Sequence, residues 1–191
     1  GQIAVGRDLA TSAGIYDHLA STPLTDFWFL RKAGVLNTVV GRNSDTITLT
    51  QGSTSATLGA TVTGSLAGYR LQVAGLGTLP LISAHSSGSA SITLDASWPE
   101  ATQSAVTCNI FKLANTLASD FLRFASPPYV HNSYAGGISV GALQNRAQNW
   151  PLYYAPQGAP TMAFMTGPLT VEVNAWDTRA YRFEYEYVAL P

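Results

Sequence analysis

The sequence predicts an α+β chain that is rich in β-structure. Three observations indicate this class: an apolar stripe at helical spacing near the N-terminus, a long Ser/Thr/Gly-rich stretch with period-2 alternation, and two strongly alternating runs near the C-terminus. We expect short N-terminal helices in residues 1–36 and an inserted small β-barrel or sandwich module in 37–114. Residues 115–191 should form a C-terminal antiparallel β-hairpin region that completes the core with the N-terminal segment.

The N-terminal segment is predicted to hold two short helices. Its first apolar stripe consists of Leu9, Ala13, Tyr16 and Ala20. Pro23 then breaks the chain, and Thr25 can cap a second helix that contains residues 27–30. Arg31 and Lys32 suit the C-terminal end of that helix, which Gly34 closes or weakens.

The middle segment alternates between apolar and polar residues over short runs. Alternation is clearest at 46–50, 90–94 and 106–110, and Gly- and Ser-rich turns separate the runs. Five or six short strands at this spacing predict a small sandwich or barrel. Between Thr46 and Phe111 the only charged residues are Arg70, Asp95 and Glu100.

The C-terminal segment is predicted to hold one helical turn and three strands. The turn lies in 117–124, and the strands lie at 161–165, 169–175 and 181–187. The last two strands are joined by residues 176–179, so an antiparallel hairpin is the natural interpretation. The Tyr/Phe stripe of the last strand is more consistent with a core face than with a ligand-stacking platform, because an antiparallel sheet normally buries one side.

Composition excludes several classes of protein. A net charge of −1 excludes a basic nucleic-acid binder, and a mean hydropathy of +0.11 argues against a disordered chain. No apolar run is long enough to span a membrane, and the first 30 residues contain no signal-peptide core, so we expect a protein made inside a cell. Charged residues make up only 11% of the chain, which is better tolerated when partners cover the surface. This indicates an assembly subunit.

Catalytic chemistry is poorly supported. His18, His85 and His131 show no metal-ligand spacing, and the single Cys108 lies in an alternating run that predicts a buried side chain. Glu184 and Glu186 could share a proton if buried, but the alternation places them opposite the aromatic face. The sequence contains no phosphate-binding loop and no nucleophile elbow. We therefore expect no enzyme, no cofactor and no metal.

Two aromatic clusters bear on partners. Phe27, Trp28 and Phe29 are consecutive in a predicted helix, so they cannot all point into one core, and at least one should meet another module or subunit. Trp150 with Tyr153 could instead serve as a stacking platform for a sugar or a base.

The order of segments resembles the head-to-tail connector (adaptor) proteins in the neck of tailed bacteriophages. The resemblance rests on DFWFL at 26–30, TITLTQGSTS at 46–55, GYRL at 68–71, SITLD at 91–95, LASDF at 117–121, WPLY at 150–153 and YEYVALP at 185–191. The middle runs are similar to a β-module inserted in many phage neck proteins. LASDF is similar to the Leu-Pro-x-Asp-Phe segment that leaves this module in relatives, with Ala118 in place of the more usual Pro.

The resemblance implies a mechanical function. It implies a homo-oligomeric ring, with twelve copies as the expected number, docked at the portal vertex between the portal protein and a tail or nozzle protein. DNA would be passing cargo only, no membrane would be involved, and the protein would reside in the neck of the virion after synthesis in the host cytoplasm. The residues implied in subunit and partner contacts are Phe27, Trp28, Phe29, Tyr185, Tyr187, Leu190 and Pro191.

Two other functions stay open at this point. One is a carbohydrate- or receptor-binding β-module on a virion or cell surface, which would use Trp150 or Tyr153. The other is a hydrolase of unusual type that would use Glu184 and Glu186.

Overall fold

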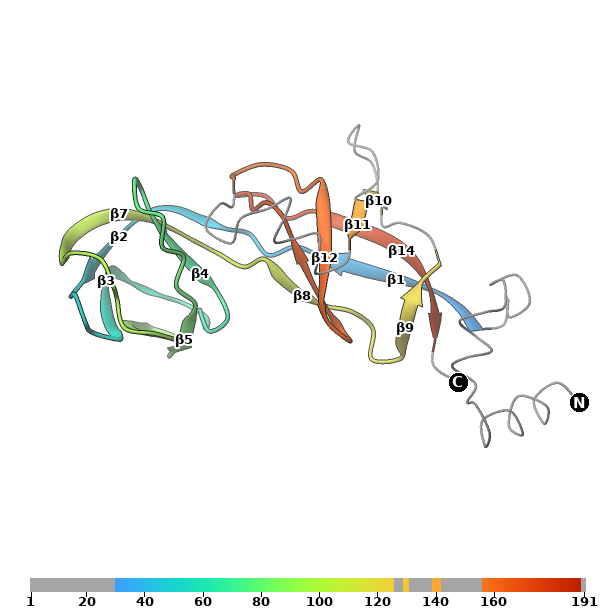
Figure 1. The fold of residues 1–191 in the computed structure, drawn as a ribbon, viewed down its shortest axis with the longest axis horizontal. Coiled ribbons are helices and arrows are strands. Elements are labelled where there is room, and N and C mark those ends of the chain that lie inside the picture. Colours follow the sequence, from blue (N-terminus) through green and yellow to red (C-terminus); the bar gives the residue numbers. More distant parts are fainter. Residues whose placement is uncertain (1–29, 126–128, 131–138, 142–155, 190–191) are drawn as a thin grey trace, which may run out of the picture.

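The computed structural model describes residues 30–125, 129–130, 139–141 and 156–189. These residues form β-strands in three sheets and contain no α-helix. The α+β class is therefore wrong, because the described chain is nearly all β. Figure 1 shows two units side by side along the long axis, which we call the base and the β-module.

The base contains two sheets. In the first, β14 (Arg182–Ala189) lies in the centre, with β1 (Arg31–Asn37) on one side and β9 (Phe121–Phe124) and β10 (Tyr129–Val130) on the other. The second sheet has the order β11-β12-β13-β8. Its strands are β8 (Ala114–Thr116), β11 (Ser139–Gly141), β12 (Met162–Gly167) and β13 (Thr170–Val173).

The two sheets of the base share one core. Buried apolar side chains come from β1 and β14 of the first sheet and from β12 and β13 of the second. The largest fully buried members are Phe111, Phe183 and Val171. Because burial of apolar area is the main favourable term in folding, this shared core holds the two sheets together.

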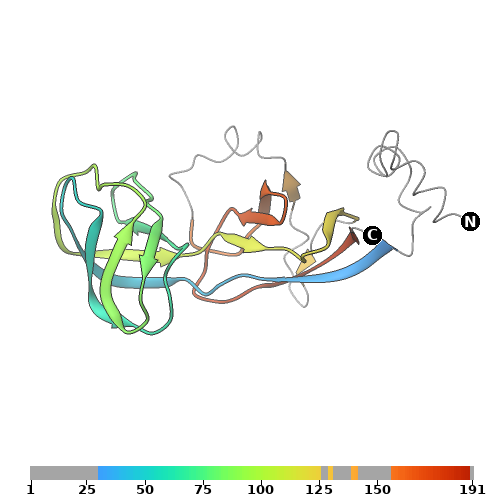
Figure 2. The ribbon, with the colours of Figure 1, turned by 90° about the horizontal axis from the view of Figure 1, so that it is seen from below.

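The β-module comprises residues 42–111 and is inserted between β1 and β8, as Figure 2 shows. It is one six-stranded sheet in the order β4-β7-β2-β3-β6-β5. Its strands are β2 (Arg42–Leu49), β3 (Ser55–Val62), β4 (Arg70–Val73), β5 (Ile82–His85), β6 (Ser89–Leu94) and β7 (Gln103–Phe111). The strands that the sequence predicts at 46–50, 90–94 and 106–110 are confirmed as parts of β2, β6 and β7.

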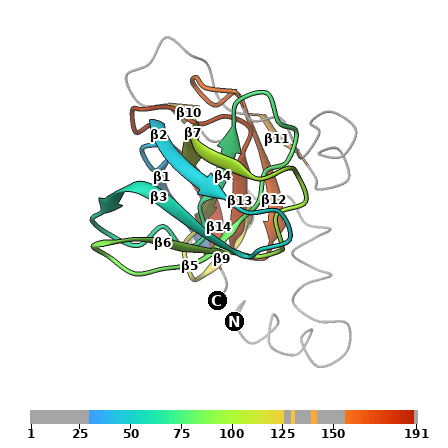
Figure 3. The same ribbon diagram turned by 90° about the vertical axis from the view of Figure 1, so that its left-hand side faces the viewer.

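The sheet of the β-module curls until its two edge strands meet (Figure 3). The Leu71 N–H donates to the Pro80 carbonyl at 3.0 Å, the Ile82 N–H donates to the Tyr69 carbonyl at 2.7 Å, and an isolated bridge joins Arg70 to Leu81. The enclosed core is separate from that of the base and includes Trp98, which is 1% exposed.

The predicted end of the second helix is in fact strand β1. Its seven residues pair with β14 in an unbroken antiparallel register from Arg31↔Val188 to Asn37↔Arg182. Local helix signals fail here because pairing with a neighbouring strand outweighs intrinsic preference. The predicted stripe from Leu9 to Ala20 and the aromatic run at 27–29 lie outside the described residues.

The predicted C-terminal hairpin pairs the wrong strands. β13 and β14 lie in different sheets, and β13 instead forms an antiparallel pair with β12. A period-2 pattern indicates which face of a strand is buried but does not indicate its partner. The predicted helical turn at 117–124 is also wrong over Phe121–Phe124, which forms β9 against β14.

Candidate functional site

The LASDF segment contains a polar contact group that ties β1 to β14. The Lys32 Nζ lies 2.6 Å from Oδ2 of Asp120, and the Tyr187 hydroxyl donates to Oδ1 of Asp120 at 2.8 Å. We call Lys32, Asp120 and Tyr187 the Asp120 cluster. The hydrogen bond from Lys32, with that from Tyr187, lowers the pKa of the Asp120 carboxyl. Burial of the ring, together with the bond to Asp120, raises the pKa of Tyr187 to about 12.

Aromatic rings pack directly beside the Asp120 cluster. Phe121 and Phe124 lie edge to face at 4.7 Å between ring centroids, and Phe124 meets Tyr185 in the same way at 5.4 Å. The Tyr185 hydroxyl accepts the N–H of Ala118 at 3.3 Å. The Asp-Phe pair of LASDF therefore has two structural tasks, since Asp120 holds two strands and Phe121 fills the core between them.

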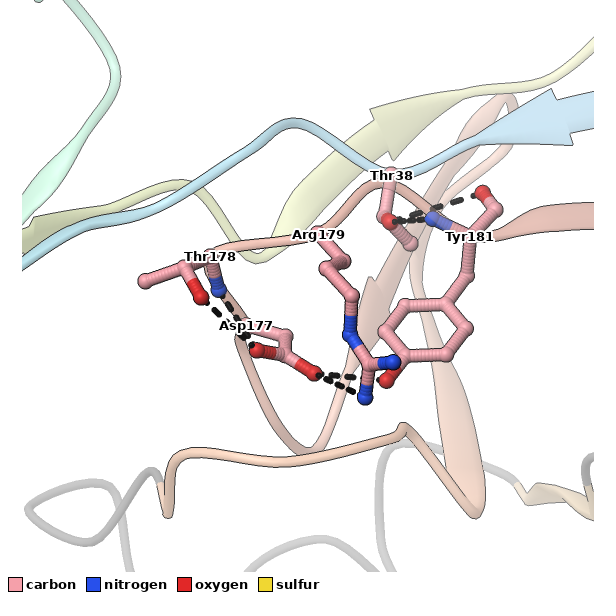
Figure 4. A network of polar contacts seen from close by, with 5 residues as sticks. All are labelled: Thr38, Asp177, Thr178, Arg179 and Tyr181. Atoms are coloured by element: carbon pink, nitrogen blue, oxygen red, sulfur yellow. Dashed lines mark hydrogen bonds and ion pairs between the residues drawn. The ribbon is translucent and has the colours of Figure 1, made fainter.

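A second polar group joins the segment that connects β13 to β14 with the residue that follows β1; Figure 4 shows its five residues. We call it the Asp177 cluster; it consists of Thr38, Asp177, Thr178, Arg179 and Tyr181. The Tyr181 hydroxyl donates to Oδ2 of Asp177 at 2.6 Å, and Thr178 donates its N–H to Oδ1 at 2.6 Å. The hydrogen bond from Tyr181 is the main cause that lowers the pKa of the Asp177 carboxyl.

The Asp177 cluster fixes the segment that leaves the base. The Thr38 N–H donates to the Tyr181 carbonyl at 2.9 Å, and the Tyr181 N–H donates to the Thr38 hydroxyl at 2.8 Å. The Gly41 N–H donates to the Asp177 carbonyl at 2.7 Å. Residues 38–41 are therefore held against the 177–181 segment just before the β-module begins.

Trp176 joins the two units at the returning segment. Its ring stacks on Phe111, the last residue of β7, with 4.9 Å between centroids and 2° between planes. Trp176 also lies so close to Gly41 that a Cβ there would overlap the indole. Arg70 of the β-module lies 4.0 Å from Glu172 of β13. Packing and charge at this junction thus hold the β-module to the base.

The outer face of the β-module carries hydroxyl side chains and few charges. Thr46, Thr48, Thr57, Ser91 and Thr107 are exposed, and they stand side by side across four strands. We call these five residues the hydroxyl face.

The three charged side chains between Thr46 and Phe111 are used elsewhere. Arg70 donates to the Leu79 carbonyl at 3.2 Å, Asp95 accepts the Leu81 N–H at 3.0 Å, and Glu100 accepts the Thr78 hydroxyl at 2.7 Å. The hydroxyl face can therefore be covered without desolvating a charge.

Of the interface residues that the sequence predicts, two are buried in the base and the others lie outside the described residues. Tyr185 and Tyr187 are 2% and 4% exposed, so their rings belong to the core of the base, as the aromatic stripe suggested. Phe27, Trp28, Phe29, Leu190 and Pro191 lie outside the described residues. Trp150 and Tyr153 of the stacking-platform hypothesis lie outside them as well.

The titratable residues singled out from the sequence occupy ordinary structural positions where they are described. Glu184 forms an ion pair with Arg182 of the same strand at 3.3 Å, and Glu186 is exposed beside it. His85 accepts the Leu66 N–H at Nδ1, so Nε2 carries the proton that is shared with the Ser89 carbonyl at 3.1 Å. His18 and His131 lie outside the described part.

The predicted burial of Cys108 is confirmed. The side chain is 1% exposed, and burial raises the pKa of its thiol to about 12, so the thiolate is disfavoured. Within the described ranges, no group of three His, Cys, Asp or Glu side chains is arranged to hold a metal ion. The same part of the chain has no helix long and apolar enough to cross a membrane.

Sequence reasoning missed the Asp177 cluster and the role of Trp176. The alternation on both sides of residues 176–179 predicts a hairpin turn there. The spacing of Asp177 and Tyr181, four residues apart, is nevertheless a signal for a local bond between their side chains.

Comparison of the chain with protein-family profiles, with curated proteins and with solved structures finds no significant match.

Proposed function

We propose that this chain is a structural subunit of the head-to-tail connector of a tailed bacteriophage. Copies would form a ring at the portal vertex, with the portal protein above, a tail or nozzle protein below, and DNA passing through as cargo. The observation that carries the proposal is the position of the LASDF segment. It comes after the inserted β-module and strand β8, and within the base its Asp120 binds Lys32 and Tyr187 while Phe121 packs in the core.

The arrangement of charge supports a subunit whose surface is covered in an assembly. The hydroxyl face presents neutral side chains over four strands, and the three charged residues of residues 46–111 are held in loops or at the junction. Covering such a face costs less than covering ionised groups, because no charge loses its hydration. A ring in which each copy meets two neighbours needs surfaces of this kind.

The junction supports a mechanical role in the same way. The stack of Trp176 on Phe111 and the bonds from the Asp177 cluster to residues 38–41 hold the two chain segments that connect the units. A subunit that transmits load between a head and a tail must keep its parts in a fixed relation, and packed aromatic contacts provide this.

Particles made without the protein test the proposal. We expect the host to accumulate DNA-filled heads without tails, since heads form independently of the neck, and we expect purified full-length protein to restore tail attachment and infectivity. The control is protein with Thr63 replaced by Ser, an exposed conservative change that should restore attachment fully. Normal tailed particles in the absence of the protein would contradict the proposal, and normal particles that fail to attach to cells would favour receptor binding.

A further inference from the structure

Among the described residues, β1 is an edge strand of the first base sheet. Its register with β14 places Thr38 opposite Tyr181, and the Thr38 N–H points to β14. Backbone groups alternate in direction along an antiparallel strand, so those of Lys32, Gly34 and Leu36 also point to β14. The backbone groups of Arg31, Ala33, Val35 and Asn37 therefore point away from the sheet, and among the described residues no strand pairs with them.

This edge lacks three of the features that block strand addition. It is seven residues long and contains no proline, and its register with β14 shows no bulge. Val35 is 43% exposed, and Ala33 beside it is exposed as well. Its two cations, Arg31 and Lys32, are both exposed, but they stand together at the N-terminal end of the strand, and Lys32 is held by the carboxylate of Asp120 at 2.6 Å.

We propose that two copies of this chain pair through β1, antiparallel and about a two-fold axis at Gly34. This inference concerns the free protein and is independent of the proposed connector function. The two first base sheets would join into one continuous sheet, with each β1 in its interior.

The register follows from the outward-pointing residues. With Gly34 opposite Gly34 of the second copy, Arg31 lies opposite Asn37, and Ala33 lies opposite Val35. All four outward-pointing residues of β1 then find an outward-pointing partner, whereas a shift of two residues in either direction leaves one without a partner.

The side chains favour the same register. Arg31 meets the neutral Asn37 and Lys32 meets Leu36, so no two cations stand opposite one another. Val35 and Ala33 meet on the outer face, which covers one of the two large apolar side chains that are exposed in the described chain. A second copy of β1 therefore matches this edge in length, in charge and in apolar pattern.

Sedimentation velocity of the full-length protein over a range of concentrations tests the pairing. We expect a concentration-dependent equilibrium between monomer and dimer. Val35→Pro should abolish the dimer, because it removes an outward N–H from each copy and none of the bonds to β14. Val35→Thr keeps the backbone donor and should remain dimeric, and far-UV circular dichroism with a melting temperature shows whether each variant is folded.

Charge variants test the register, and they replace Val35→Pro as the test of pairing if that variant fails to fold. Asn37→Lys places a cation opposite Arg31 at both ends of the pair and should raise the dimer dissociation constant about tenfold. Adding Arg31→Glu to Asn37→Lys should restore the wild-type constant.

A protein that stays monomeric at every concentration would overturn the inference, as would a dimer that Asn37→Lys leaves unchanged. A closed ring that Val35→Pro leaves intact would overturn β1 pairing and leave the connector proposal standing. If Val35→Pro abolishes the dimer while particles made without the protein have normal tails, β1 pairing would stand and the connector proposal would be overturned.

Discussion

Close approach of backbone to an aromatic ring decides which residues are allowed at two positions. The ring of Tyr185 lies over Gly34 of the neighbouring strand, and Trp176 lies against Gly41. A side chain at either position would occupy the space of the ring. Glycine in a strand normally costs stability, so its presence in β1 reflects this packing rather than local preference.

Gly34→Ala should therefore destabilise the base. The added Cβ would overlap the Tyr185 ring, which is 2% exposed and has no free space to enter. We expect a loss of about 1–3 kcal/mol in the free energy of unfolding, measured by urea denaturation. Gly77→Ala is the matched control, since no atom lies within 4 Å of a Cβ there. Equal stability of the two variants would contradict this packing.

Ala105 carries backbone strain in β7. Its φ of 49° lies in the left-handed region, next to a register irregularity between β2 and β7, and its N–H is bound by the Thr48 hydroxyl at 3.3 Å. Ala105→Gly relieves about 1–2 kcal/mol of strain and loses about 0.5–1 kcal/mol through chain entropy, so a small net gain in stability is expected. Ala84→Gly in β5 lacks that strain and should be destabilising, and thermal melts of the two variants distinguish these signs.

Tyr187 should make the base sensitive to alkali. Its pKa is raised to about 12 in the folded chain, against about 10 in the unfolded chain, so the folded state holds its proton more tightly. The stability that this group contributes is complete below pH 10 and is lost as the pH rises toward 12.

Tyr187→Phe should flatten that part of the profile of unfolding free energy against pH. Tyr187→Phe should remove only part of the loss of unfolding free energy at alkaline pH, because burial also raises the pKa of Tyr185. Denaturant titrations at several pH values between 8 and 12 measure it. An unchanged slope in Tyr187→Phe would show that the Asp120 cluster does not couple to this titration.

At the scale of elements, the junction couples the stability of the β-module to that of the base. The β-module has its own core, and so does the base, yet Phe111 at the end of β7 belongs to the core of the base and stacks on Trp176. This shared contact should make the two units unfold together.

Trp176→Ala should uncouple the two units. The loss of the buried ring should cost about 3–5 kcal/mol and should split a single calorimetric transition into two, with the β-module melting separately. Trp98→Ala removes a ring of the same size from inside the β-module and leaves the junction intact, so it should lower the melting temperature without uncoupling the base. A single transition in Trp176→Ala would contradict this role for the junction.

Sequence patterns predicted the strands better than their partners. The faces of β14 follow from alternation, since Phe183, Tyr185 and Tyr187 are buried as the stripe indicates. Its partners β1, β9 and β10 do not follow, because pairing depends on contacts between residues as far apart in sequence as Arg31 and Val188.

The candidate site was also only partly predictable. LASDF was singled out through its resemblance to a family, and its bonds to Lys32 and Tyr187 required the fold. The helix signals around Arg31 and Lys32 failed for the same reason: seven residue pairs with β14 outweigh local preferences for a helix end.

At the scale of the whole molecule, the chain is a pair of β-units fixed to one another at a packed junction. In the described part, the Asp120 carboxylate and the Asp177 carbonyl bind residues that are distant in sequence, Lys32, Tyr187 and Gly41. Of the surfaces formed by the described residues, the hydroxyl face and the edge of β1 suit contact with other chains. These features suit the assembly subunit that we propose.

Immunogold labelling of purified virions by electron microscopy tests this central claim most directly. With an antibody against the full-length protein, we expect gold particles only at the junction of head and tail, and none on particles made without the protein. Label on fibres or on the capsid, or no label on intact or gently disrupted virions, would contradict the connector account.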